Sequence, residues 1–291
     1  MTYLVGYSPH KDDACALALA CQFARSEAGT VHALTVVPRG WEAVDGSATD
    51  GEFEQWAAEE GEASAVEALE QLAAYPDITS TATWVTGRSV PAAMLHQATA
   101  LDASLIIVGS GLDGPEGVVT VASKTGRLLH SSHVPVAIAP RGYNPPADAR
   151  ITRVTLAFRD DDATWRLLDE VAGICQRVGA ELRLLTVALK QRMMVSSGVR
   201  RNEELVYAKL LEQVGAAQAE AVEHLAGLGV QASTEVARGT SWPDALATVP
   251  FDVGDVLIVG SSSTHRLAHV FLGSSATKIV RNARVPVVVV P

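Results

Sequence analysis

The stretch VLIVGSSSTHRLAHVFLGSSATKIVRNARVPVVVVP, residues 256–291, holds the pattern that decides the fold. It reads as a buried apolar strand ending at Gly260, a polar loop, a helix that opens at Gly273-Ser274-Ser275, and a last apolar strand. Short apolar strands alternating with helices predict a parallel sheet that helices cover on both faces. Ligands of such sheets bind at the carboxyl ends of the strands, where the strand order reverses.

The first half of the chain repeats this pattern. Three segments of the first half recur in the second half. LIIVGS, with Gly109, recurs as LIVGSS; VPVAIAP, with Pro135, recurs as VPVVVVP; and HALTVV, with Thr35, recurs as RLLTVA. In each case the equivalent residue lies 151 positions later. One offset shared by separated segments indicates an internal duplication. We therefore predict an α/β chain of two tandem domains, residues 1–142 and 150–291, each a five-stranded parallel sheet with helices on both faces. In the second domain we expect one helix over 202–225, opened by Asn202 as its N-cap.

Composition excludes several classes of function. Residues 1–140 hold 6 basic and 17 acidic residues, a net charge of −11, whereas residues 141–291 hold 17 and 16, a net charge of +1. Such a chain lacks the basic surface that duplex nucleic acid requires, and it contains no apolar run long enough to span a membrane. Its three cysteines show no CxxC spacing, and the amino-terminal residues do not resemble a signal peptide. We expect a cytoplasmic protein.

The turn at Gly273-Ser274-Ser275 has the chemistry of an anion site. Glycine permits close approach of the backbone, and the free N–H groups of a helix start face a bound anion. The pattern Gly260-x2-Ser263-x9-Gly273-Ser274 resembles the G-x2-G-x9-G-[ST] signature of ATP-binding universal stress proteins, with serine at the second glycine. The tandem repeat and the VPVVVVP ending are also similar to that UspA-like family, whose fold is that of the adenine-nucleotide alpha-hydrolases.

The resemblance implies a nucleotide site in the second copy and a degenerate site in the first. The first copy reads Gly109-x2-Leu112-x9-Ala122-Ser123, so two of its three glycines are replaced. If position 122 requires a positive φ, its Cβ costs about 1 kcal/mol or more. The family's acidic residue after the first strand, which contacts the base, is Ser8 in one copy. It is Arg159 in the other, where a one-residue shift would bring in Asp160.

Other motifs are weaker. Residues 109–114 match G-x-G-x-x-G, but Pro115 follows and a loop is expected. His265 and His269 have the spacing of a helical metal pair without further ligands, and we expect no metal site. The acidic run 160–162 is interpreted as a helix start. Trp41 and the basic segment 190–201 are expected in loops.

The resemblance implies a stress-response binding protein. Its cofactor would be ATP or a related adenine nucleotide, bound weakly by Gly260, Ser263, Gly273, Ser274 and Ser275. A nucleotide-free interaction module and a slow nucleotide hydrolase stay open as alternatives, although the sequence offers no obvious catalytic base.

The family pairs its domains face to face, which implies a pseudo-dimer of the two copies. Whole chains are also expected to form homodimers through their last strands, and a protein partner is left unidentified.

Overall fold

The computed structural model describes residues 1–8, 14–38, 48–190, 197–261 and 273–291. Each half alternates strands and helices as its sequence predicts. The first half contains β1 (Thr2–Tyr7), α1 (Ala14–Glu27), β2 (Thr30–Pro38), α2 (Ala48–Leu72), β3 (Ser80–Gly87), α3 (Val90–Ala100), β4 (Ala103–Gly109), α4 (Ser123–Ser131) and β5 (Val136–Ala139). The second contains β6 (Arg153–Ala157), α5 (Asp162–Val178), β7 (Glu181–Leu189), α6 (Ser197–Gly227), β8 (Ala232–Gly239), α7 (Trp242–Ala247), β9 (Asp255–Gly260), α8 (Ser274–Asn282) and β10 (Val287–Val290).

All these strands belong to one sheet, in the order β3-β2-β1-β4-β5-β10-β9-β6-β7-β8. Neighbouring strands are parallel within each half, as expected. The halves meet at the seam, the antiparallel pair of β5 and β10 in which Ile138 faces Val287 and Ala137 faces Val288. The two copies therefore form a pseudo-dimer within the chain, joined edge to edge in one sheet rather than face to face, and both last strands are paired there. Dimerisation of whole chains stays a prediction. Both strands are apolar, and pairing them inside the chain removes two aggregation-prone edges.

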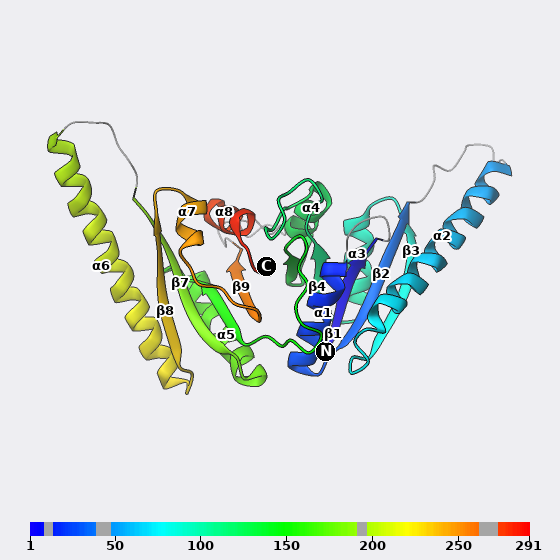
Figure 1. Cartoon of the computed structure of the whole chain (residues 1–291), viewed down its shortest axis with the longest axis horizontal. Helices are drawn as coiled ribbons and strands as arrows, with labels where there is room; N and C mark the ends of the chain where they lie inside the picture. Colours follow the sequence, from blue (N-terminus) through cyan, green and yellow to red (C-terminus); the bar gives the residue numbers. More distant parts are fainter. Residues whose placement is uncertain (9–13, 39–47, 191–196, 262–272) are drawn as a thin grey trace.

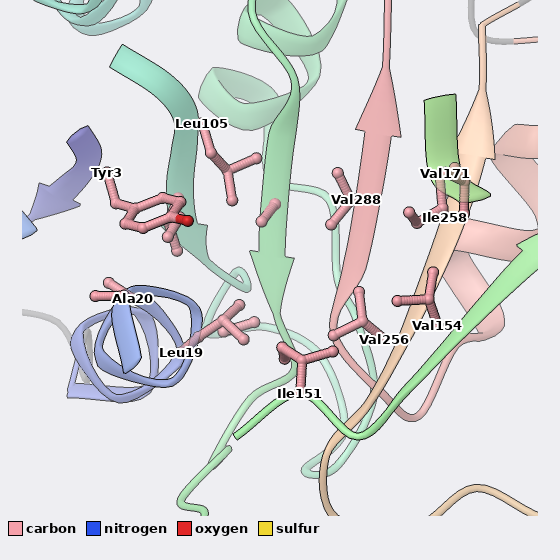
Figure 2. Packing of buried hydrophobic residues seen from close by; sticks show 14 of the residues in the cluster. Tyr3, Leu19, Ala20, Leu105, Ile151, Val154, Val171, Val256, Ile258 and Val288 are labelled. Atoms are coloured by element: carbon pink, nitrogen blue, oxygen red, sulfur yellow. The ribbon is translucent and has the colours of Figure 1, made fainter. Parts of the chain in front are cut away.

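Helices cover both faces of the sheet, because strand side chains alternate between two apolar layers. Val5 and Ile107 face the layer with α1, α2, α5 and α6, whereas Leu4 and Ile106 face the layer with α3, α4, α7 and α8. In Figure 1, α2 and α6 lie at the two ends of the molecule, and α4 and α8 lie near its middle. Figure 2 shows the first layer close to the seam, with Leu105 and Val288 projecting from β4 and β10. The two cores therefore continue across the domain boundary.

The helix α6 begins earlier than predicted. It starts at Ser197, so Asn202 lies inside it and is not the N-cap, and Arg200 and Arg201 belong to the helix rather than to a loop. The five residues before Asn202 contain no proline, so nothing in the backbone ends the helix there. By contrast, Pro91 lies in the first turn of α3, where its missing N–H costs no hydrogen bond.

The segment between the two halves contains no helix and is hydrogen-bonded to α1. The Tyr143 hydroxyl donates to Oε1 of Gln22 at 2.5 Å, and the Gln22 amide donates to the carbonyl of Arg150 at 3.1 Å. Arg25 donates to the carbonyl of Ala149 at 3.0 Å. Because α1 belongs to the first copy, these bonds fix the start of the second copy against it.

Two further features of the described chain are the character of its helices and the state of its cysteines. Among the described residues, no helix combines the length and the apolar character that crossing a bilayer requires. The three cysteines, Cys15, Cys21 and Cys175, are buried and form no disulfide. Burial raises the pKa of the Cys21 and Cys175 thiols to about 12, so both are held in the neutral form.

Candidate functional site

A cavity of about 530 Å³ opens at the carboxyl ends of β6, β7 and β9 in the second half. β6 and β9 are neighbours in the sheet although β7 and β8 separate them in the chain, so the strand order reverses here. This is the place where open α/β sheets bind ligands, and the volume lies in the range of small-molecule sites. The polar part of its wall consists of Arg159, Asp161, Asp162, Thr164, Thr186, Ser261, Ser274 and Ser275.

The start of α8 forms one wall of this cavity. Gly273 is its N-cap and makes no side-chain capping bond, whereas its carbonyl accepts from the Thr277 amide at 2.9 Å. The first N–H groups of a helix have no partner within the helix, and no cap side chain in the described part of the chain satisfies them. Ser274 is exposed and Ser275 is half-buried, and both line the cavity. Uncapped amides and the positive end of the helix dipole therefore face a space that can hold an anion.

The backbone corrects the strain expected in the first copy. Gly273 has φ −57° and the corresponding Ala122 has φ −68°, so neither position adopts a left-handed conformation. A Cβ at position 122 therefore carries no backbone strain. The loss of that glycine does not by itself disable the first copy.

The end of β6 brings Arg159 and Asp161 together. Arg159 Nε donates to the Asp161 carboxylate, and the Thr164 amide and hydroxyl donate to Oδ1 of Asp161 at 2.9 Å each. Asp161 is therefore the N-cap of α5, as an acidic helix start predicts. Burial opposes its ionisation, but these hydrogen bonds outweigh burial and hold the pKa of the Asp161 carboxyl below its usual value. It stays ionised inside the cavity wall, with Arg159 as its counter-charge.

Asp160 does not take the place of the family's base-contacting acid. Its carboxylate accepts from the indole N–H of Trp165 at 2.9 Å, and it is not part of the cavity wall. Trp165 in turn stacks edge-on against Phe158, with ring centroids 5.7 Å apart. The one-residue shift considered for Asp160 is therefore wrong, because this aromatic pair holds the residue outside.

An aromatic side chain closes another side of the cavity. Trp242 follows the N-cap Ser241 at the start of α7 and lines the cavity. The ammonium of Lys278, one turn into α8, lies 5.7 Å from the centre of the Trp242 ring. The residue after the N-cap of the corresponding helix α3 is Val90. The second copy thus has an aromatic face where the first has an aliphatic side chain.

Thr186 is fixed at the floor of the cavity. Its hydroxyl donates to the carbonyl of Phe158 at 3.0 Å and accepts from the Gln218 amide at 3.2 Å. Gln218 is buried and also donates to the carbonyls of Leu184 and Glu235. The side chain is therefore oriented by bonds that link β6, β7, α6 and β8.

The first copy has a cavity at the equivalent place. It measures about 360 Å³ and also adjoins a helix start, that of α4, which Ala122 leaves without a side-chain cap. Its wall is more apolar and includes Met94, Leu112 and the carboxylate of Asp113. The loop after β4 is held by Ser110, which donates to the carbonyl of Ala139 at 2.7 Å. As expected, the G-x-G-x-x-G match in this loop opens no helix.

Four of the five predicted site residues come together. Gly260, at the end of β9, lies in one wall with Gly273, Ser274 and Ser275, and the fifth, Ser263, lies outside the described residues. Predictions for Trp41, His265 and His269 fall outside them too. Where the chain is described, no group of three or more His, Cys, Asp or Glu side chains is arranged to hold a metal ion.

Sequence reasoning missed Asp161, Thr164, Thr186 and Trp242 as parts of the wall. Thr186 could have been found, because it lies in the carboxyl-terminal half of β7 and repeats Thr35 at the 151-residue offset. Trp242 carries a weaker signal, the Ser-Trp-Pro start of a helix after β8. The role of Asp161 depends on the turn after β6, and no sequence pattern separates it from Asp160.

Comparison with known proteins gives matches over the whole chain. The model of the universal stress protein family matches residues 1–140 and 150–291. Universal stress proteins of Mycobacterium tuberculosis and Mycobacterium bovis are each 34% identical over 295 residues, covering 100% of both chains. The crystal structure of a universal stress protein from Archaeoglobus fulgidus superposes with a TM-score of 0.61 at 16% identity, covering 99% of this chain and 97% of that one.

Proposed function

The chain belongs to the universal stress protein family, and from this membership and the geometry of its second cavity we propose that it is an adenine-nucleotide-binding protein. The proposed ligand is ATP or a related adenine nucleotide, bound by the second copy. Gly260, Gly273, Ser274 and Ser275 would contact its phosphates, together with Ser263. We place the protein among binding proteins rather than enzymes, because the ionised Asp161 is already engaged as a helix cap and ion-pair partner.

One observation carries this proposal: the uncapped start of α8 lies in the wall of a cavity at the point where the strand order reverses. Hydrogen bonds to a charged group contribute about 1.5–3 kcal/mol each. Three bonds from this turn contribute roughly 4–9 kcal/mol before the entropic cost of binding. Micromolar affinity requires about 8 kcal/mol net. Phosphate contacts alone therefore support weak binding.

The net charges of the two halves favour the second copy, whereas the described walls do not: Arg159 faces Asp161 and Asp162 in the second cavity, and Lys124 and Asp113 line the first. Its half of the chain is close to neutral, whereas residues 1–140 carry a net charge of −11, which opposes a polyphosphate. The second cavity is also larger, at about 530 Å³ against 360 Å³. Its base-binding end has Arg159 in place of the family's acid, so recognition of the base would rest on other groups, such as the Trp242 ring.

The decisive experiment is calorimetric titration of the full chain with ATP, using Gly273→Asp and the matched control Ala122→Asp. Both positions are N-caps with negative φ, where aspartate is a favourable residue. Gly273→Asp places a carboxylate on the amides that would bind phosphate, and should weaken binding at least about tenfold, or 1.4 kcal/mol. Ala122→Asp should leave the affinity unchanged.

The alternatives give different results in the same experiment. Loss of binding in Ala122→Asp alone would place the nucleotide in the first copy. Unmodified protein that binds no ATP at millimolar concentration, and that purifies without nucleotide, would instead be an interaction module. Phosphate release that Gly273→Asp abolishes would identify a slow hydrolase.

A further inference from the structure

A third cavity, of about 220 Å³, lies in the layer of α1 and α5 and is built by both copies. It shares no residue with the two cavities at the carboxyl ends of the strands. α1 packs on β1, β4 and β5, and α5 packs on β6, β7 and β9. Val288 and Val290 of β10, between these sets of strands, belong to its wall. The cavity therefore exists because two domains are joined at the seam.

Its walls are apolar and deeply set. Tyr3, Leu105, Val256, Ile258 and Val288 are each at most 6% exposed, and all line the cavity. Figure 2 shows these side chains on the same face of the central strands, next to α1. A protein partner needs apolar side chains that reach the surface. Walls this deeply set are accessible instead to a molecule small enough to enter.

Three polar side chains of the cavity wall, Glu27, Arg177 and Tyr3, are bonded to one another. Arg177 of α5 donates to Glu27 of α1 at 3.2 Å, and the Tyr3 hydroxyl donates to the other oxygen of Glu27 at 2.9 Å. Burial, followed by the charge of Glu27, raises the pKa of Tyr3, so its hydroxyl stays neutral. Glu170, exposed at the rim, adds a negative charge. An anionic ligand is therefore disfavoured, and an uncharged one is accommodated without leaving a charge unpaired.

We propose that this seam cavity binds a small uncharged molecule, mostly apolar, with one hydroxyl group directed to the Glu27–Arg177 pair. An apolar cavity of about 150 Å³ stays dry and takes up benzene. The larger volume here matches a fused pair of rings or a short branched chain. This site is independent of nucleotide binding, because it lies on the other face of the sheet.

The test uses 1-naphthol as the probe and methyl NMR of the unmodified full chain as the readout. The methyl resonances of Val171, Ile258 and Val288 should shift saturably with the probe. 1-Naphthalenesulfonate, which carries the same ring with a fixed negative charge, should bind at least about tenfold more weakly. Shifts restricted to residues of other cavities, no saturation at the solubility limit of the probe, or equal binding of the sulfonate would overturn the proposal.

A variant pair tests the place of the site. Ile174→Phe enlarges a half-buried residue of the wall and should weaken 1-naphthol binding at least about tenfold, because the larger side chain takes up space that the probe would occupy. Leu210→Phe makes a similar change on the exposed side of α6 and should have no effect. Analytical ultracentrifugation of the unmodified chain and of both variants measures their oligomeric state and tests whether the cavity is instead an interface between two chains. If the unmodified chain dimerises and Ile174→Phe alone abolishes the dimer, the cavity is an interface between two copies and the proposal fails.

Discussion

Ala137 of β5 and Val288 of β10 are equivalent residues of the two copies, 151 positions apart, and they lie directly opposite one another in the seam. The pseudo-twofold axis that relates the halves therefore passes through this pair. A contact between two identical domains would place identical residues here. In the single chain the pair has become unequal, so each side of the axis can be changed separately.

The seam pair predicts a compensated double substitution. Ala137→Val adds volume to a fully buried position and should cost about 1–3 kcal/mol of unfolding free energy. Val288→Ala removes buried methyl groups and should cost about 1.5–3 kcal/mol. The double variant exchanges the two side chains and restores the volume, so its cost should be smaller than the sum. Urea unfolding measures all three, and additive costs would show that the residues do not share one space.

Asp255 predicts a large loss of stability. Its carboxylate is 1% exposed, accepts from Arg153 at 2.6 Å and lies 3.6 Å from Arg183. Burial, and then the neighbouring Arg153, lowers the pKa of Arg183, so that guanidinium depends on Asp255 for its charge balance. Asp255→Asn should cost about 3–5 kcal/mol in denaturant unfolding. Asp252→Asn, at the exposed partner of Arg153, should cost at most about 1 kcal/mol; equal costs would argue against the buried pair.

The cap of α5 predicts a pH-dependent contribution. Because the pKa of Asp161 is lowered by folding, its stabilisation is present above the ordinary carboxyl pKa of 3.8 and is lost as the pH falls through the lower folded value. Asp161→Ala should cost about 0.5–2 kcal/mol at pH 7, and this difference should shrink below pH 3.8. Ser89→Ala removes the uncharged cap of α3, whose first turn contains no acidic residue, so its cost should not change with pH. Unfolding of both variants between pH 7 and pH 2 makes the comparison.

Trp242 predicts a difference between the two cavities. If a nucleobase stacks on its ring, Trp242→Val, which installs the residue of the first copy, should weaken ATP binding by about 1–3 kcal/mol. Trp242→Phe should retain most of the affinity, because the aromatic face is kept. Calorimetry measures both, and equal affinities for the valine and phenylalanine variants would exclude stacking.

The buried thiols predict resistance to modification. With pKa values of about 12, Cys21 and Cys175 have almost no thiolate at pH 8, and they are buried. Ellman's reagent should therefore leave both unmodified in the folded protein and label them after unfolding in guanidinium. Rapid labelling of the folded chain, located by peptide mass mapping, would contradict this packing.

Local pattern was enough to predict both copies and most of their elements. The 151-residue offset located the second copy from the first, and α8 begins at Ser274, within the turn where a helix start is expected. The seam could not be predicted, because the pairing of β5 with β10 depends on which edges meet in three dimensions. The start of α6 was placed too late because Asn202 resembles a cap, whereas the uninterrupted backbone before it allows further turns.

The sequence predicted those residues of the candidate site that lie close together in one segment of the chain. Gly260 and Gly273 to Ser275 belong to a single strand–loop–helix unit, so their meeting was visible in the sequence. Thr186 and Trp242 reach the same cavity from β7 and α7. Their position there depends on the order of the strands in the sheet, which the sequence does not show. The choice between Asp160 and Asp161 depends on a hydrogen bond to Trp165, which only the packing of α5 reveals.

Joining β5 to β10 also affects the behaviour of this chain at high concentration. The most apolar strands, VAIA and VVVV, occupy the centre of the sheet, and the ends are β3 and β8. These end strands carry serine, threonine, glutamate and arginine, with many side chains exposed. Apolar segments without charge are the ones that stack into fibrils, so the fusion of the two copies hides the segments most prone to form amyloid.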